Sequence, residues 1–223
     1  MSPASEDGLM RIVHYGHSCV LVETETARVL IDPGAFSSGF EQLRELDAVM
    51  ITHQHFDHID AEKLPGLLQA NPSARLITDP GTQELVSKLG LESETAYPGQ
   101  SLQLGETPVH VVGGEHAVIH QDIPTVANVG YVFDNGAFYH PGDSFSVPQH
   151  RIDVLGLPTA APWLKASEAV DFLRAVKPRI AVPIHEAVLV NPAMHYGLFT
   201  NLAPEGTEVR VLSKGEALEA QRV

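Results

Sequence analysis

The segment AVMITHQHFDHID at residues 48–60 constrains this chain more than any other. It begins as a continuous apolar run, which is typical of a strand covered on both faces. His53 and His55 follow the run, and in an extended segment two residues spaced in this way point to the same side. Asp57 and His58 come next, where a turn would bring them back toward that side. The segment therefore predicts a buried strand whose end delivers metal-ligating side chains to one place.

An exposed polar loop is the ordinary alternative for such a cluster, because loop histidines are satisfied by water or by the backbone. Three histidines and one aspartate at these spacings are rare by chance. Imidazoles and carboxylates suit Zn²⁺, and carboxylate-rich sites also accept Mn²⁺ or Fe²⁺. We therefore expect a site for two divalent metal ions, with Zn²⁺ as the expected metal and Mn²⁺ or Fe²⁺ as alternatives.

The rest of the chain reads as strands and helices in a mixed α/β (α+β) order. The first and last thirds alternate β-rich and helical segments, whereas the middle third has the features of antiparallel strands, including the hairpin signal DNG at 134–136. A helix is expected from residue 81, with Thr82 as its N-cap. We expect a single domain over residues 1–223, with two mixed sheets packed face to face and helices outside. The expected strands are 10–15, 19–24, 27–32, 47–52 and 74–78.

Composition excludes several classes of function. The net charge is −14 and no basic run is present, so clustered phosphate contacts to nucleic acid or to an anionic membrane are not expected. The chain has no apolar run long enough to span a membrane, and its start lacks the pattern of a signal peptide. Cys19 is the only cysteine, which rules out an intrachain disulfide. We expect a cytoplasmic protein, and the sequence leaves homo-oligomerisation open.

The pattern His-x-His-x-Asp-His is the signature of the metallo-β-lactamase superfamily, and the chain resembles that family at several further points. These are Asp32 in VLIDPG, His116 in GGEHAVIH, Asp143 in FYHPGDSF and His185 in AVPIH. The resemblance implies a four-layer αββα sandwich. Within the superfamily, HYGHSCVLVE and YHPGDS are most similar to the uncharacterised metal-dependent hydrolases near L-ascorbate-6-phosphate lactonase.

The resemblance also implies a division of labour among the candidate site residues. One metal ion would take three histidines, the other would take an aspartate and two histidines, and one aspartate would bridge the two. Two further residues would orient these ligands from behind, and two residues would act in catalysis. The first ion's ligands are His53, His55 and His116, the second ion's are Asp57, His58 and His185, the bridge is Asp143, the supporting residues are Asp32 and His17, and the catalytic residues are Asp57 and His140.

Several histidines remain open alternatives from the residues alone. His120 competes with His116 as the isolated third histidine, although the Gly-Gly bend before His116 favours the latter. His110 lies in an alternating strand segment, where a surface role is expected. Trp163 is expected either to cover a core edge or to form a wall of the substrate pocket.

The ligand set predicts a metal-dependent hydrolase. Two metal ions that share a water lower its pKa from 15.7 toward about 7, so a metal-bridged hydroxide is expected to attack a small-molecule ester, lactone or phosphodiester. The alternatives are a non-catalytic metal-binding or scaffold protein of the same fold, and a metal-dependent nuclease. Loops rather than the metal motif determine the substrate, so its identity does not follow from the sequence.

Overall fold

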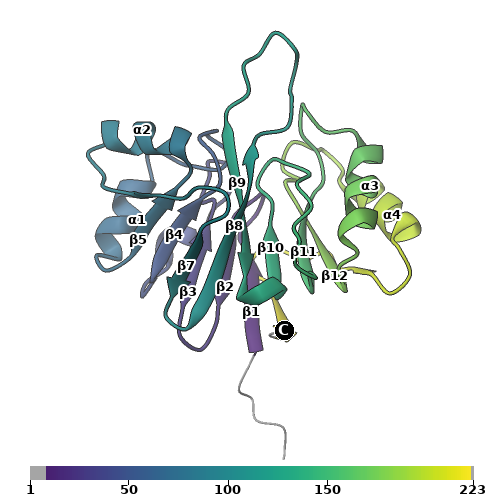
Figure 1. The fold of residues 1–223 in the computed structure, drawn as a ribbon, viewed down its shortest axis with the longest axis horizontal. Coiled ribbons are helices and arrows are strands. Elements are labelled where there is room, and N and C mark those ends of the chain that lie inside the picture. The colour runs from purple at the N-terminus through teal and green to yellow at the C-terminus, as the bar shows by residue number, and fades with distance from the viewer. Residues whose placement is uncertain (1–8, 222–223) are drawn as a thin grey trace, which may run out of the picture.

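Two seven-stranded mixed sheets lie face to face in the computed structural model, which describes residues 9–221 (Figure 1). The first sheet has the order β14-β1-β2-β3-β4-β5-β6 and the second the order β13-β12-β11-β10-β9-β8-β7. The strands of the first sheet are β1 (Leu9–His14), β2 (Val20–Glu23), β3 (Arg28–Ile31), β4 (Ala48–Ile51), β5 (Arg75–Thr78), β6 (Glu94–Thr95) and β14 (Ala217–Gln221). Those of the second are β7 (Ser101–Leu104), β8 (Thr107–Glu115), β9 (Ala127–Phe133), β10 (Phe138–His140), β11 (Val154–Pro158), β12 (Ile180–Ile184) and β13 (Glu208–Val209).

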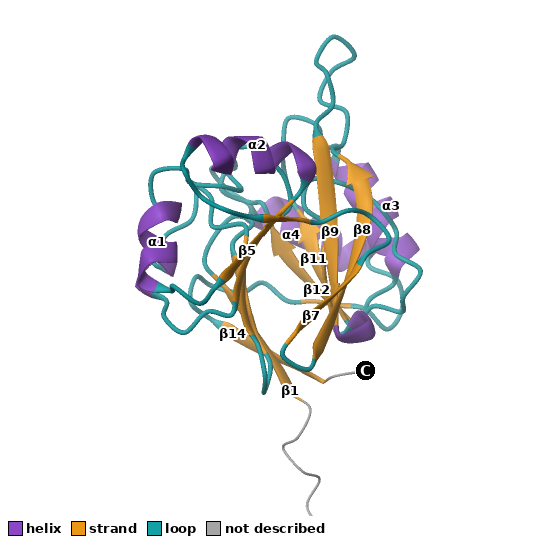
Figure 2. Ribbon diagram, turned by 60° about the vertical axis from the view of Figure 1, so that its left-hand side comes forward, coloured by secondary structure: helices purple, strands orange, loops and turns teal. Residues whose placement is uncertain are grey.

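Four α-helices and two short 3₁₀ helices complete the described fold, and the α-helices cover the outer faces of the sheets (Figure 2). One apolar cluster joins α1 and α2 to the first sheet, and a second joins α3 and α4 to the other sheet. A third cluster lies between the sheets and contains side chains from both. The helices are α1 (Leu64–Ala70), α2 (Pro80–Lys88), α3 (Ala166–Val176), α4 (Ala193–Leu202), η1 (Phe40–Gln42) and η2 (Asp134–Gly136).

The parallel strands explain where polar groups gather. Strands β3, β4 and β5 run parallel to one another, as do β10, β11 and β12. Strand β4 is buried at all four positions, in agreement with its continuous apolar sequence. Since the carboxyl ends of parallel strands lie at the same edge of a sheet, the loops after these strands meet at one end of the sandwich. Functional side chains are placed at such edges in open α/β sheets.

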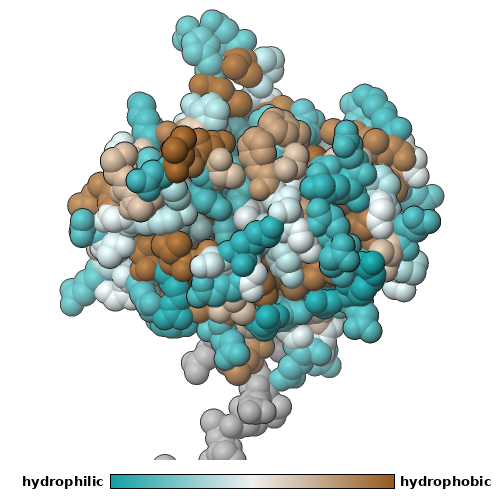
Figure 3. All heavy atoms as spheres, turned by 180° about the vertical axis from the view of Figure 1, so that it is seen from behind, coloured by the Kyte–Doolittle hydropathy of each residue, from teal (hydrophilic) through white to brown (hydrophobic). Residues whose placement is uncertain are grey.

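A loop of residues 116–126 projects beyond the ends of β8 and β9 (Figure 1). Val118 and Ile123 on this loop are 63% and 49% exposed. Seen from behind, the projection has a hydrophilic tip with hydrophobic side chains nearer its base (Figure 3). The remaining surface in that view mixes hydrophobic and hydrophilic residues.

The expected αββα sandwich is confirmed, with one correction at a helix start. Helix α2 begins at Pro80, and its N-cap is Asp79 rather than Thr82. The Asp79 carboxylate accepts hydrogen bonds from the backbone N–H groups of Gly81 and Thr82, which leaves Thr82 inside the first turn. Within residues 9–221, no helix has the length and apolar character needed to cross a membrane.

Candidate metal centre

Two groups of four metal-ligand side chains meet where the strands of both sheets end. The eight residues come from five separate connections, and in each group the candidate ligand atoms lie within 4.8 Å of one another. Most of these residues are buried. The first group is His53, His55, His116 and Asp143, and the second is His17, Asp57, His58 and His185.

Asp143 lies between the two groups and presents one carboxylate oxygen to each. Its Oδ2 is 3.3 Å from His116 Nε2 and 3.9 Å from His53 Nε2. Its Oδ1 is 3.0 Å from His58 Nε2 and 3.2 Å from His185 Nε2. A carboxylate in this position is suited to bridging two cations.

Backbone carbonyls and Asp32 determine the tautomers of three of these histidines. His116 Nδ1 lies 2.6 Å from the carbonyl of Ala117, and His185 Nδ1 lies 2.6 Å from that of Ala160, so each Nδ1–H donates to an oxygen. In both rings the Nε2 lone pair then faces the other members of its group. Such an outward hydrogen bond is the usual support for a metal-binding imidazole.

Asp32 provides the same support for His58. Its Oδ2 accepts from His58 Nδ1 at 2.7 Å and from the Thr52 hydroxyl at 2.7 Å, while its Oδ1 accepts from the Thr52 backbone N–H. Asp32 is completely buried and does not belong to either ligand group. Its geometry is that of a residue which orients His58 from behind.

His17 contacts Asp57 and lies close enough to belong to the second group. The backbone N–H of Ala187 donates to His17 Nδ1, so a neutral His17 carries its proton on Nε2 and donates it to Asp57 Oδ2 at 3.0 Å. The ring of His17 also lies 3.9 Å from that of His185, centroid to centroid. In this tautomer His17 holds Asp57 in place and has no lone pair to offer to a metal ion.

Unpartnered buried atoms test whether these residues fit a metal. His58 Nε2, His116 Nε2, His185 Nε2 and Asp143 Oδ1 are all buried. Although each lies 3.0–3.3 Å from an atom of the opposing group type, none makes a hydrogen bond of normal geometry. Leaving buried polar atoms unsatisfied costs about 1–3 kcal/mol each, so four that converge need a common explanation. Divalent metal ions at the two groups would satisfy all four, and imidazole and carboxylate groups are suitable ligands.

The pKa values of two histidines in the metal-free chain also indicate a site for cations. Burial lowers the pKa of His185, but Asp143 and Asp57 outweigh that effect and raise the pKa to about 9. Burial likewise opposes protonation of His58, yet Asp143 and Asp32 raise its pKa well above the ordinary value. Protons on these two histidines thus offset the two carboxylates that face the centre. Bound cations would take over that role from the protons.

Three of the candidate residues adopt left-handed backbone conformations although none is a glycine. The φ angles are +52° at His17, +48° at Asp32 and +61° at His185. Non-glycine residues seldom adopt this conformation, and they are found in it mainly where surrounding structure requires it. At all three positions the chain leaves a strand and turns the side chain back toward the centre.

Two glycines permit close packing of the loops around the centre. A Cβ on Gly34 would lie 1.8 Å from the carbonyl oxygen of Asp57, so only glycine lets these two loops touch. Gly142, with φ +60°, precedes Asp143, and a Cβ there would lie 2.3 Å from the Asn128 side chain. Asn128 in turn accepts a hydrogen bond from the backbone N–H of Asp143 at 2.9 Å.

The catalytic role expected for His140 is not supported by its surroundings. His140 is completely buried, its Nε2 donates to the carbonyl of Ser18, and its Nδ1 accepts from the backbone N–H of Gly142. Because both ring nitrogens are engaged by the backbone, the side chain is not free to donate a proton to a leaving group. We instead assign it to holding the loop before Asp143 against the loop after β1.

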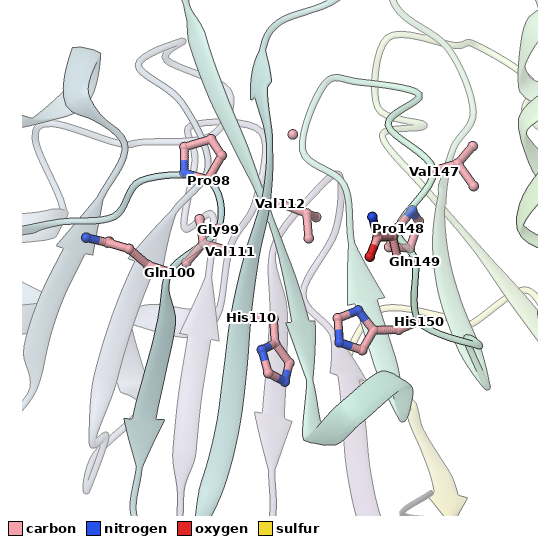
Figure 4. Close-up of a pocket in the computed structure, with 11 residues that line it drawn as sticks. Pro98, Gly99, Gln100, His110, Val111, Val112, Val147, Pro148, Gln149 and His150 are labelled. Carbon is pink, nitrogen blue, oxygen red and sulfur yellow. The ribbon is translucent and has the colours of Figure 1, made fainter.

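His120 and His110, which the sequence left open, lie outside both groups, as do His150 and His195. His120 is on the exposed projecting loop, where its Nδ1 accepts from the backbone N–H of Asp122, so the structure brings His116 and not His120 to the centre. His110 stacks on His150 in a separate groove of the second sheet, with ring centroids 4.6 Å apart (Figure 4). His195 lies in α4 beside Phe199.

Two supporting residues escaped sequence reasoning altogether. Thr52 contacts Asp32 and also lies 3.1 Å, through its hydroxyl, from His53 Nδ1; its position just before the motif was the only available signal. Asn128 is buried between the loops, and nothing in its local sequence marks it. Trp163, which was expected to serve the core edge or the pocket, donates its indole N–H to Asp143 Oδ2 at 2.8 Å.

Comparison with known proteins agrees with this geometry. The family model described as the β-lactamase superfamily domain matches residues 11–185, a range that includes every candidate metal ligand. The chain belongs to the metallo-β-lactamase superfamily.

Individual relatives match this superfamily member over most of its length. The protein Rv0786c of Mycobacterium tuberculosis is 46% identical over 215 residues, covering 94% of this chain and 99% of its own. A UPF0173 metal-dependent hydrolase of Geobacillus sp. is 28% identical, covering 94% of this chain and all of its own. Among solved structures, Igni18, a metallo hydrolase from Ignicoccus hospitalis, has a TM-score of 0.73 at 21% identity, covering 95% of this chain and 98% of its own. The narrower resemblance to the lactonase branch stays a prediction.

Proposed function

We propose that this protein is a metal-dependent hydrolase of small molecules, acting through two divalent ions at the two ligand groups. The observation that carries the proposal is the position of Asp143, which offers one oxygen to His53 and His116 and the other to His58 and His185. Relatives named as metal-dependent hydrolases support it. We further propose that residues 1–223 act as one domain, since both sheets contribute to one central core.

The residues divide between the two ions as the sequence suggested. His53, His55 and His116 would hold one ion, and Asp57, His58 and His185 the other, with Asp143 shared. Zn²⁺ is the proposed metal, with Mn²⁺ or Fe²⁺ as alternatives for such ligands. Bound there, the ions would activate a water as nucleophile and stabilise the negative charge that develops on the substrate oxygen.

Side chains of the protein would orient the water and the metal ligands. Burial would raise the pKa of Asp57, but His17 and His185 hold it well below its ordinary value, so the carboxylate stays ionised. An ionised Asp57 at the edge of the pocket accepts a hydrogen bond from water and orients it. His17 keeps Oδ2 of Asp57 in place, and Asp32 keeps His58 aligned.

A cavity beside the centre favours catalysis over a purely structural site. It has a volume of about 340 Å³ and is lined by His55, Asp57, His116, Asp143 and His185 together with apolar side chains. Structural metal sites are closed by protein ligands, whereas catalytic ones keep access for water and substrate. The nuclease alternative finds no support here, because no lysine or arginine is among the described residues that line the cavity.

The proposal is tested by metal content and hydrolysis together. Protein purified without chelators should contain about two metal ions per chain, and Asp143→Ala should reduce that content and abolish hydrolysis of generic esters and bis-phosphodiesters. His110→Ala is the matched control, because it removes an imidazole outside both groups. Less than one metal per chain, with no hydrolysis after Zn²⁺ or Mn²⁺ is added, would overturn the proposal.

A further inference from the structure

The walls of the cavity beside the candidate metal centre are apolar. Five lining residues belong to the two ligand groups, and we call them the floor: His55, Asp57, His116, Asp143 and His185. Its other lining residues share a hydrophobic character: Phe36, Phe56, Ile119, Pro162, Trp163 and Val188.

One wall is a pair of aromatic rings held at the mouth. Phe36 and Phe56 pack edge to face with ring centroids 5.2 Å apart, and Phe36 packs in the same way on His17 at 5.2 Å. They nevertheless remain 44% and 63% exposed. Large apolar side chains gathered at an exposed cavity mouth are typical of a binding surface rather than of a fold requirement.

A second part of the lining is also apolar and is partly rigid. Trp163 is 8% exposed and is held by its hydrogen bond to Asp143 and by edge contact with Phe145 at 5.1 Å. Val188 also lines the cavity and is 46% exposed. A ligand in this cavity therefore meets aromatic rings, the indole and aliphatic groups.

Charged groups are restricted to the cavity floor. Asp57 and Asp143 are the only Asp, Glu, Lys or Arg side chains among the described lining residues, and both belong to the ligand groups, as do the lining histidines. Lys63, the cation on the segment after the histidine motif, is engaged by Glu41 and Asp60. A substrate with a negative charge away from its reacting group would thus meet no counter-charge on the walls.

We propose that the substrate of this site is a carboxylic ester or lactone whose remaining part is uncharged and apolar, of medium chain length. This inference rests on the proposed hydrolase function. The carbonyl carbon would lie at the floor and the alkyl or aryl part against the apolar lining. Hydrolysis breaks the bond from that carbon to the leaving oxygen: water gives its oxygen to the carbon and a proton to the leaving group.

The test measures ligand binding as well as turnover. A failure of the substrate inference can then be distinguished from a failure of the hydrolase proposal. Straight-chain hydroxamates, from acetohydroxamate to octanohydroxamate, are titrated into the metal-loaded protein. Binding is followed by the fluorescence of Trp163, the single tryptophan of the chain and part of the cavity wall. Affinity should rise about two- to fourfold per methylene until the walls are covered. In parallel, kcat/KM for 4-nitrophenyl acetate, butyrate and octanoate should rise in the same order.

A matched pair of variants tests whether the gain in affinity per methylene comes from the apolar lining of the cavity. Val188→Lys places a cation on the cavity wall and should reduce the gain per methylene to less than about half of the wild-type gain. Val211→Lys makes the same change at a valine that is equally exposed, at 44%, but does not line the cavity, and should leave the gain unchanged.

Each outcome of these measurements bears on the substrate inference, on the hydrolase proposal or on both. Equal affinities across the series in a protein that binds metal would overturn the inference and leave the metal centre standing. A loss of the gain in Val211→Lys equal to that in Val188→Lys would also overturn it. A chain-length gain without turnover of any ester would support the apolar cavity and overturn the hydrolase proposal. A protein that binds no metal would overturn both.

Discussion

The indole N–H of Trp163 donates to Asp143 Oδ2 at a distance of 2.8 Å, and both side chains are buried. This is the oxygen that faces His116 and His53. The hydrogen bond therefore acts on the carboxylate that lies between the two ligand groups. It orients one oxygen toward each group and ties the cavity wall to the candidate metal centre.

Trp163→Phe should weaken metal binding while the fold is retained. The phenyl ring replaces most of the apolar volume but loses the N–H donor, and loss of such a supporting hydrogen bond lowers metal affinity about 10- to 100-fold. Competition with a chromogenic chelator measures the change. Phe145→Leu is the control, since Phe145 packs on Trp163 without being paired to Asp143. Equal metal affinity in Trp163→Phe and wild type would show that the hydrogen bond has no such role.

Asp32→Asn should also weaken metal binding, by about 10- to 100-fold. The change removes the charge that accepts the His58 Nδ1–H, while asparagine tolerates the left-handed backbone at this position. Chelator competition and the rate of ester hydrolysis are the readouts. Asp47→Asn, at an exposed carboxylate that accepts from the Arg28 backbone N–H away from the centre, should change neither. Normal affinity in Asp32→Asn would refute the role assigned to Asp32.

Metal affinity should rise with pH up to about pH 9. Without metal, His185 has a pKa of about 9 and the pKa of His58 is raised well above its ordinary value, so at neutral pH metal must displace protons from both. Each displaced proton contributes about a tenfold rise in affinity per pH unit. Titration calorimetry in buffers of different ionisation enthalpy counts the protons released. His185→Asn should release one proton fewer, and a pH-independent affinity would contradict the prediction.

The metal-free protein should lose stability in the same pH range. The pKa of His185 is about 9 when folded and about 6.5 when unfolded, so the folded state binds more protons between these values. Its stabilising contribution is complete below about pH 6.5 and is lost as pH rises through about 9, by roughly 3 kcal/mol. Urea unfolding of the metal-free chain across this range measures the loss. Saturation with metal should remove it, because His185 is then unprotonated throughout.

Gly34→Ala and Gly66→Ala should act in opposite directions. The new methyl group at Gly34 would overlap the carbonyl of Asp57, so the motif loop must move, and we expect a loss of at least about 2 kcal/mol in unfolding free energy. At Gly66, in α1, nothing lies within 4 Å, and alanine should stabilise by about 0.5–1 kcal/mol. Urea unfolding compares the two. A Gly34→Ala protein as stable as Gly66→Ala would disprove the close contact.

Much of the fold and the candidate ligand set follows from local sequence. The apolar run before His53 predicts β4, and the other candidate ligands stand directly after strand-like segments. That those residues meet was expected from the resemblance to the superfamily. The choice between His116 and His120 was open because no local pattern shows which ring reaches the centre, although the Gly-Gly bend directly before His116 favoured it.

The remaining features depend on contacts between distant segments. Strand β14 has the unremarkable sequence ALEAQ and exists because it pairs with β1, a partner more than 200 residues away in the chain. The bond from Trp163 to Asp143 likewise joins two loops that no local pattern connects. His140 stands three residues before Asp143 and was expected in catalysis, yet its ring nitrogens serve the backbone.

The left-handed backbones at His17, Asp32 and His185 place this protein under a stability–activity trade-off. Each costs about 1–2 kcal/mol relative to an ordinary conformation, and glycine at any of the three positions would remove that cost together with the side chain. Selection for thermal stability alone would therefore favour the loss of these three residues. Their presence here is therefore explained by what their side chains do at the centre and not by stability.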